Sequence, residues 1–294
     1  MTHFSFRQGI FGEFSVYPIP TASELSMFYE QKYFQELSSS GYSSAYSKKE
    51  LDHISIKDQE TIFAINQYAN IYNADILEIG FGEGFFLKKL KTNGARICGV
   101  DFSTFGISKH NPDILDFVIQ GSIEDTLLKF RNEKKFFDVI IAKHVLEHSR
   151  SPVDLVEQCE SILKPNGLLF VQVPNDFSSL QTWLVENGFV DHQYWVSIPE
   201  HLHYFEKRSI VELIESFSFK VLDVYSTFPI DWFLFNTNSN YIKDPKLGKD
   251  SHLARVNLEL LISRNDWVQA HKFYQALIDI GMGRDICLIA RKQN

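Results

Sequence analysis

The sequence predicts an α/β protein in which helices cover both faces of a mostly parallel sheet. Three observations predict this class. Short apolar runs, typical of buried strands, alternate with helical segments between residues 75 and 175. A glycine-rich turn follows the first of these runs, where a strand of such a sheet would meet a helix. The chain has 294 residues and is 44% hydrophobic, which suits one large domain with additions or two modest domains.

Residues 1–72 precede the alternating pattern, and we expect them to form an arm and a helical lid over the ligand site. The first twenty are aromatic and broken by glycine and proline, which favours an irregular arm or short strands. Thr21 or Ser23 can cap a helix that runs to about Leu37, and a second helix is expected from about Lys48 to Tyr72.

Residues 73–227, together with the end of the chain at 283–294, are expected to form the core. The predicted strands are 75–80, 95–101, 116–121, 136–145, 166–175, 219–227 and 285–292. Helices are predicted at 85–91, from Ser103, and at 152–163. Residues 228–282 are too many for a plain loop, so they should form a helical insertion, with helices at 253–263 and 266–280. This insertion would shape the substrate pocket or bury a dimer contact, as in a homodimer.

Charge and composition exclude several classes of partner. The formal net charge is −8 and no run of lysine and arginine is dense, which argues against nucleic acid. The three cysteines form no C-x-x-C pair, so neither a zinc ribbon nor a disulfide framework is expected. No apolar stretch reaches membrane-spanning length, and the first residues lack a signal-peptide pattern. We therefore expect a cytoplasmic protein with no membrane partner.

The strongest chemical signal is a turn with three glycines, Gly80, Gly82 and Gly84, between the first core strand and its helix. Glycine lets the backbone turn tightly and approach a ligand closely. The spacing is G-x-G-x-G, whereas dinucleotide-binding proteins carry G-x-G-x-x-G. This difference argues against an NAD-dependent dehydrogenase.

A second signal lies at the end of the next strand, where Asp101 follows Gly82 by nineteen residues. A carboxylate there can accept hydrogen bonds from both hydroxyls of a ribose. The alternative is an aspartate that caps the helix after Phe102 and Ser103. Phe102 is placed to lie against an adenine face, and the turn at Ser122 can offer a backbone amide and an acceptor side chain to the adenine edge. Together these features indicate adenosine binding.

The ordered combination of motifs resembles the class I S-adenosylmethionine-dependent methyltransferases. ILEIGFGEG resembles their motif I, and GVDFS resembles their ribose-binding motif. FDVIIAKHVLEH followed by LKPNGLLFVQVPN resembles the branch related to ubiquinone-biosynthesis O-methyltransferases, which includes enzymes that methylate sugars. The resemblance covers residues 74–175 well and extends through PEHLHYF to the last strand. It implies a Rossmann-like, doubly wound, seven-stranded sheet whose last strand is antiparallel.

The resemblance also implies S-adenosylmethionine as the cofactor and a role for each matching residue. Glu78 and the backbone around Gly80 should face the methionine part, where a carboxylate suits the ammonium group. Relatives often carry aspartate where this chain has Ser122. The implied cofactor site comprises Glu78, Gly80, Phe81, Gly82, Gly84, Asp101, Phe102, Ser103, Ser122, Ile123, Lys143 and His144.

Methylation of a hydroxyl also needs a base, and histidine titrates near neutral pH. The candidates are His144, His148, His192, His201 and His203. His201 is the first choice, because a similar E-H-x-x-Y-F segment lies near the acceptor in sugar methyltransferases. The alternative is that His201 and His203 alternate along a short strand and only satisfy backbone groups.

His144 and His148 are four residues apart at the start of a predicted helix, so they should share a face. With Glu147 they suggest a metal site. In this family pattern, however, the L-E-H run is chiefly structural, so we expect no metal.

The predicted function is therefore methyl transfer from S-adenosylmethionine to a small-molecule acceptor. The preferred acceptor is a sugar hydroxyl on a nucleotide-linked sugar or a surface glycan. A quinone or phenolic precursor is the first alternative, and a membrane-facing amphipathic helix would favour it. A non-catalytic protein that binds S-adenosylmethionine is the second alternative, and the presence of a usable base would argue against it.

Overall fold

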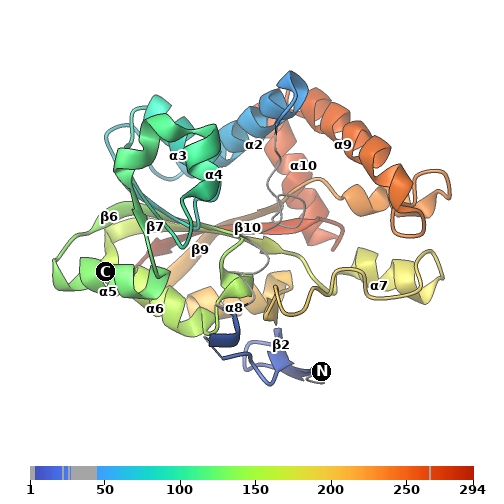
Figure 1. The fold of residues 1–294 in the computed structure, drawn as a ribbon, viewed down its shortest axis with the longest axis horizontal. Helices are drawn as coiled ribbons and strands as arrows, with labels where there is room; N and C mark the ends of the chain where they lie inside the picture. The colour runs from blue at the N-terminus through green and yellow to red at the C-terminus, as the bar shows by residue number, and fades with distance from the viewer. Residues whose placement is uncertain (1–3, 22, 26, 28–44, 265) are drawn as a thin grey trace.

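A computed structural model describes residues 4–21, 23–25, 27, 45–264 and 266–294, and its centre is a seven-stranded sheet (Figure 1). The strand order is β5-β4-β3-β6-β7-β10-β9. The strands are β3 (Asp75–Ile79), β4 (Arg96–Asp101), β5 (Val118–Gln120), β6 (Phe137–Lys143), β7 (Leu163–Pro174), β9 (Phe219–Ser226) and β10 (Asp285–Lys292). Only β10 runs against its neighbours, β7 and β9, within this described sheet. The predicted doubly wound sheet with an antiparallel last strand is confirmed.

Helices cover both faces of this sheet (Figure 1). They are α2 (Lys48–Asn66), α3 (Phe85–Thr92), α4 (Phe105–His110), α5 (Ile123–Asn132), α6 (Pro152–Ile162), α7 (Ser179–Glu186), α8 (Lys207–Glu215), α9 (Gly248–Ile262) and α10 (Trp267–Asp279). Apolar residues of α2, α3 and α10 pack on one face, and those of α5, α6 and α8 pack on the other. The predicted helices in the insertion correspond to α9 and α10.

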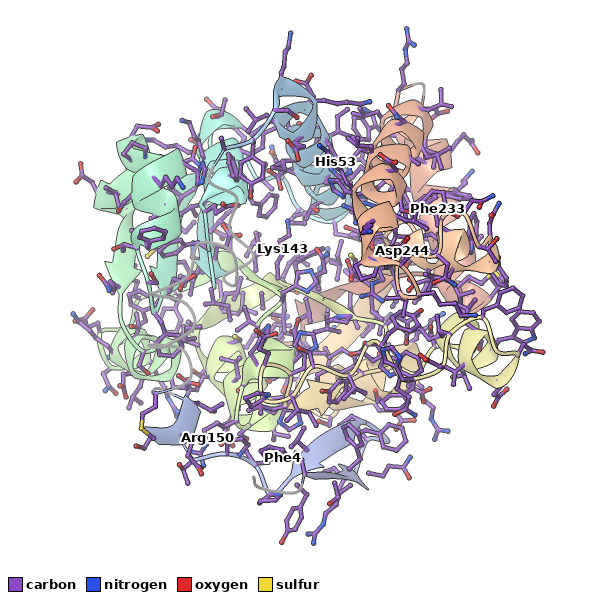
Figure 2. The ribbon with its side chains drawn as sticks, turned by 45° about the vertical axis from the view of Figure 1, so that its right-hand side comes forward. Phe4, His53, Lys143, Arg150, Phe233 and Asp244 are labelled. Atoms are coloured by element: carbon purple, nitrogen blue, oxygen red, sulfur yellow. The ribbon has the colours of Figure 1, made fainter. Side chains whose placement is uncertain are left out.

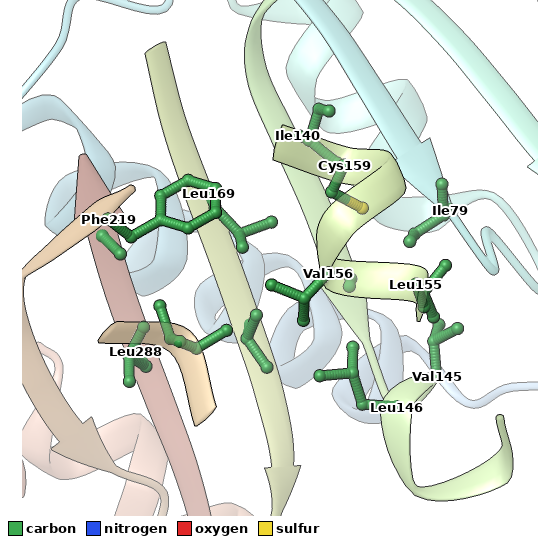
Figure 3. Close-up of a cluster of buried hydrophobic side chains, with 14 of the residues drawn as sticks. Ile79, Ile140, Val145, Leu146, Leu155, Val156, Cys159, Leu169, Phe219 and Leu288 are labelled. Atoms are coloured by element: carbon green, nitrogen blue, oxygen red, sulfur yellow. The ribbon is translucent and has the colours of Figure 1, made fainter. Parts of the chain in front are cut away.

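Alternation along each strand builds these two cores. In β3, Ile76 belongs to the cluster under α2 and α3, while Leu77 and Ile79 belong to the cluster under α5 and α6. Figure 3 shows part of the second cluster, in which Val156 and Cys159 of α6 face the sheet. Strands buried on both faces explain why the sequence shows nearly continuous apolar runs.

A smaller antiparallel sheet joins the start of the chain to the segment before α8. Its strands are β1 (Ser5–Gln8), β2 (Phe14–Tyr17) and β8 (His203–Tyr204), in the order β1-β2-β8. Ser15 pairs with His203 in this sheet. The short strands expected in the arm are therefore present, and they hold the PEHLHYF segment.

Some predicted elements need correction. The second helix ends at Asn66, six residues early, because the Asn66 side chain accepts the Ile71 amide in a turn. The predicted helix around His144 and His148 is wrong: the segment holds a single 3₁₀ turn, η2 (Leu146–His148), and the backbone of His144 has φ of 54°.

The first predicted helix is described only at its start. Thr21 caps the first helix, since its hydroxyl accepts the Glu24 amide, but most of that helix and the following loop lie outside the described residues. None of the described helices is long and apolar enough to cross a membrane. The division into arm, core and insertion stays a prediction.

Candidate functional site

The glycine turn lies at the carboxyl ends of the parallel strands, as predicted. Gly80, Gly82 and Gly84 have φ of 72°, 54° and 76°, a region that glycine adopts without strain. A Cβ atom on Gly80 would lie 2.5 Å from the Val145 side chain, and one on Gly84 would lie 2.7 Å from Ile107. The turn therefore needs glycine both for its conformation and for its close packing.

Asp101 joins this turn to the end of β4. Its Oδ2 accepts the Gly82 amide at 2.9 Å, and its Oδ1 accepts the Ser103 amide at 3.0 Å. The Gly121 amide donates to the Asp101 carbonyl, so the ends of β3, β4 and β5 are tied together. The capping alternative for Asp101 is wrong, because the N-cap of α4 is Thr104 and the Asp101 side chain instead closes the turn before that helix. Each carboxylate oxygen keeps a second lone pair, so ribose binding remains compatible with these bonds.

The residues predicted around the adenine differ in exposure. Phe102 is 60% exposed and has a free face for a ring. Ser122 caps α5 by accepting the Asp125 amide at 3.2 Å. Phe81 and Ile123 are only 5% and 6% exposed, and their side chains pack in hydrophobic clusters. These two residues therefore have mainly backbone to offer a ligand.

A group of charged side chains lies beneath the glycine turn. Glu78 on β3 is 3% exposed, and its Oε2 has no hydrogen-bond partner among the described residues. Burial raises the pKa of Glu78 to about 8, although the nearby Lys143 works in the other direction. Lys143, at the end of β6 near the middle of Figure 2, has its Nζ 3.5 Å from Asp58 on α2.

These groups fit the cofactor that the sequence resemblance implies. A buried carboxylate oxygen without a partner suits an ammonium group. Three glycines with positive φ let the backbone approach a bound molecule closely. The open face of Phe102 suits an aromatic base.

His144 directly follows Lys143 and begins a second group of polar side chains. Its Nδ1 lies 3.1 Å from a Glu147 carboxylate oxygen, and its Nε2 lies 3.1 Å from the Gln172 amide nitrogen. Asp285, the first residue of β10, accepts from Gln172 at 3.0 Å and from Thr227 at 2.9 Å. Burial disfavours the charged imidazole, but Glu147 and Asp285 outweigh it, so the pKa of His144 is raised.

His148 and His201 also lie beside Glu147, and His148 Nε2 is 3.9 Å from the Glu147 oxygen that His144 contacts. Their ring centres are 4.9 Å apart, and His148 Nδ1 contacts the Glu200 carbonyl at 2.7 Å. Glu147, His148 and His201 bring possible metal-ligand atoms within 4.8 Å of one another. Burial and the neighbouring His148 lower the pKa of His201 to about 4. The absence of a metal stays a prediction.

His203 is separate from this group. Its Nδ1 contacts the Ser15 hydroxyl at 2.8 Å across the small sheet, and burial lowers its pKa to about 4. This contact within a short strand agrees with the alternative in which His203 has a structural role. His192 is exposed and contacts Asp191.

A third set of polar groups was not found from the sequence. Arg284 Nη1 lies 3.4 Å from Asp231, which also accepts from the Tyr194 hydroxyl at 2.6 Å. Asp176 is 2% exposed, and burial raises its pKa to about 8, while Arg284 lowers it. For the neighbouring His144 group one signal was available in the sequence, because Gln172 is a polar residue inside the apolar run of β7.

Comparison with known proteins identifies the family. A family model described as a methyltransferase domain matches residues 51–224. A ubiquinone biosynthesis O-methyltransferase of Histophilus somni is 26% identical in an alignment of 169 positions, and the match covers 50% of this chain and 69% of that protein.

Solved structures agree with the fold. An S-adenosylmethionine-dependent methyltransferase of Archaeoglobus fulgidus has a TM-score of 0.51 at 17% identity, with 91% of this chain and 99% of that chain covered. A 1,6-didemethyltoxoflavin-N1-methyltransferase of Burkholderia thailandensis, with its substrate and S-adenosylhomocysteine bound, has a TM-score of 0.53 at 10% identity, and both chains are fully covered. The chain therefore belongs to the methyltransferase domain family and is an S-adenosylmethionine-dependent methyltransferase.

Proposed function

We propose that this enzyme methylates a hydroxyl group of a sugar, and that His144 is the base. The observation that carries the proposal is the contact of His144 with Glu147 on one ring nitrogen and with Gln172 on the other. The tautomer with hydrogen on Nδ1 donates to Glu147 and leaves Nε2 as an acceptor. A carboxylate behind an imidazole orients the ring and stabilises its protonated form.

The cofactor site proposed for this reaction follows the carboxyl ends of β3, β4, β5 and β6. Glu78 would hold the ammonium group, Asp101 the ribose, and Phe102 the adenine face. S-adenosylmethionine, when bound, supplies a methyl group on a positively charged sulfur. Val145, next to His144, lies against the Gly80 turn, so the base is close to the cofactor loop.

The chemistry left to the chain's own residues is alignment and proton removal. The acceptor oxygen would form its bond to the methyl carbon as the sulfur–carbon bond breaks, and its proton would pass to His144 Nε2. In the free enzyme the one lone pair of Nε2 accepts the Gln172 amide, so the acceptor hydroxyl must displace that hydrogen bond, and the Gln172 amide then keeps Asp285 as its acceptor.

Carboxylates around this base support a polyhydroxylated acceptor. Asp285 lies 4.0 Å from His144 Nε2, and Asp285 and Asp231 both contribute to the electrostatic environment of Arg284. Carboxylates accept hydrogen bonds from hydroxyl groups, and together they disfavour a second anion such as a phosphate at the reacting end. A neutral sugar ring meets both conditions.

A phenolic or quinone precursor is the second candidate. The curated relatives are named for ubiquinone biosynthesis, and an aromatic group of Phe177, Trp195 and Tyr204 lies beside the His201 segment. Aromatic walls suit a flat apolar ring.

The test is an acceptor screen with matched histidine variants. Purified enzyme, S-adenosylmethionine and either nucleotide-linked sugars and glycosides or catechols would be incubated, and methylated products would be identified by mass spectrometry. We expect methylated sugars. Products from catechols alone would replace the sugar proposal with the phenolic one.

The variants decide the base. His144→Gln should lower kcat by about a hundredfold or more while leaving the affinity for S-adenosylhomocysteine unchanged. His201→Gln is the matched comparison, and a larger loss there would move the role to His201. Because the base must be neutral and its pKa is raised, kcat of the wild type should fall as the pH drops through and below neutrality.

A further inference from the structure

Three ionisable side chains from three different elements lie under the cofactor turn. Glu78 pairs in register with Ile141, so Glu78 and Lys143, two residues further along β6, point to the same face of the sheet. That face is covered by α2, which contributes Asp58, only 5% exposed. We call Asp58, Lys143 and Glu78 the charge row.

The charge row is incompletely paired. Lys143 Nζ lies 3.5 Å from Asp58 and 4.3 Å from the centre of the Phe86 ring, and neither contact is a short charged hydrogen bond. Glu78 Oε2 has no hydrogen-bond partner within the described parts of the chain. Buried charges are costly unless they are paired and hydrogen-bonded. The row therefore has unused capacity for one cation and one anion.

Other charged groups near the row are few. Among the described residues, Asp101 on β4 faces Glu78, and Lys89 on α3 faces Asp58. Lys89 donates to the Ser55 hydroxyl of α2 at 3.0 Å, so it already has a partner. An ammonium and a carboxylate on one carbon atom would match the free capacity of Glu78 and Lys143.

We propose that Lys143 of the charge row binds the carboxylate at the amino-acid end of the cofactor, and that Asp58 on α2 holds Lys143 in place. Glu78 is the carboxyl that the family resemblance already assigns to the ammonium group of the same amino acid. Lys143 is then a specificity-determining residue, Asp58 is a positioning residue, and α2 is part of the cofactor site. The inference concerns the cofactor alone, so it stands or falls independently of the proposed acceptor.

A purely structural role makes a different prediction. If Lys143 only ties β6 to α2, its loss should weaken every adenosine ligand alike. If it binds the carboxylate, the loss should appear only with ligands that carry the amino-acid end. S-adenosylhomocysteine carries this end and 5′-methylthioadenosine lacks it, while both share the adenosine thioether.

The experiment is calorimetric titration of the full chain with these two ligands. Lys143→Met should weaken S-adenosylhomocysteine about tenfold or more, as expected for a charged hydrogen bond, and leave methylthioadenosine within about twofold. Lys143→Arg should restore most of the affinity. Lys89→Met is the matched control, because it removes another lysine that contacts α2, and it should change neither ligand.

The positioning role of Asp58 is tested by combining its substitution with that of Lys143. Asp58→Ala should weaken S-adenosylhomocysteine selectively, and the double variant should be no weaker than Lys143→Met alone, since both changes remove one interaction. Methylthioadenosine binding reports that each variant is folded. Equal losses for both ligands, or an unchanged affinity of Lys143→Met for S-adenosylhomocysteine, would overturn the proposal.

Discussion

Glu78 shows how one buried carboxyl can couple ligand binding to a proton. Its pKa of about 8 means that it carries a proton near neutral pH in the free enzyme. An ammonium group placed beside it favours the ionised form, so its pKa falls and the proton leaves. We therefore expect S-adenosylhomocysteine binding at pH 7 to release close to one proton, and fewer as the pH approaches 9.

Calorimetry in phosphate and in Tris measures this release, because the two buffers differ in their ionisation enthalpies. Glu78→Gln, which keeps the shape of the side chain, should abolish most of the release. Glu133→Gln, at an exposed position whose ion-pair partner among the described residues is Lys129, is the control and should change nothing. An unchanged proton count in Glu78→Gln would assign the release to another group, such as Asp101.

Some individual site residues could be predicted from the sequence and others could not, for physical reasons. Glycines in a strand-to-helix turn have few alternative uses, so Gly80, Gly82 and Gly84 were visible. Asp231 and Arg284 look like ordinary surface charges in the sequence. Only the fold brings them together, and residue types alone do not report a contact across fifty positions.

The helix pair α2 and α9 depends on one buried carboxylate. Glu259 on α9 is 2% exposed and contacts His53 at 2.7 Å and Lys57 at 3.1 Å, both on α2. Burial would raise its pKa, but Lys57 and the His53 hydrogen bond outweigh burial and lower it to about 2. Figure 2 shows His53 on α2 beside the C-terminal helices.

Glu259→Gln should lower the free energy of unfolding by roughly 3 kcal/mol at pH 7, since it removes the buried carboxylate that His53 and Lys57 share and leaves Lys57 with Glu60 alone. The folded pKa lies below the ordinary value of 4.5. The carboxylate therefore stabilises the protein above about pH 4.5, and this stabilisation disappears as the pH falls toward 2.

Urea unfolding at pH 7 and at pH 3 measures both effects. The gap between wild type and variant should narrow at the lower pH. Glu212→Gln removes an exposed partner of Arg208 and should cost less than about 1 kcal/mol. Similar costs for the two variants would contradict the role given to Glu259.

Helices and strands were predictable where a residue pattern repeats along them. They were not predictable where the backbone conformation of a single residue ends the element. The strands of the core were found because burial on both faces makes them apolar throughout. The segment after β6 was assigned to a helix because His144, Glu147 and His148 have helical spacing. Its backbone instead turns at His144, with φ of 54°, which spacing cannot reveal.

At the scale of the whole molecule, the order of motifs in the sequence predicted the cofactor side of the site but not the proposed acceptor side. The cofactor turns follow β3, β4 and β5, which are consecutive in the chain and neighbours in the sheet, so motif order predicted their meeting. The proposed acceptor side joins β6 and β7 to β10, more than a hundred residues later. Only the antiparallel insertion of β10 brings Asp285 beside Gln172, and the resemblance implied that strand without its side-chain contacts.

A cofactor site built from several strand ends should also stabilise the whole fold. A ligand that binds only the folded chain adds about 2.7 kcal/mol at one hundred times its Kd. For a chain of this length we expect S-adenosylhomocysteine to raise Tm by about 5 to 10 °C, and NAD to leave it unchanged.

Thermal unfolding with each ligand would separate a ribose contact of Asp101 from its hydrogen bonds to the backbone amides of Gly82 and Ser103. Asp101→Ala removes both, whereas Asp101→Asn keeps one backbone acceptor but loses the charge and one oxygen. If Asp101 holds the ribose, both variants should lose most of the Tm increase given by S-adenosylhomocysteine. Asp113→Ala, which removes an exposed partner of Lys88, should keep it. A full increase in Asp101→Asn would mean that Asp101 only shapes the glycine turn, and that the ribose is held by other groups.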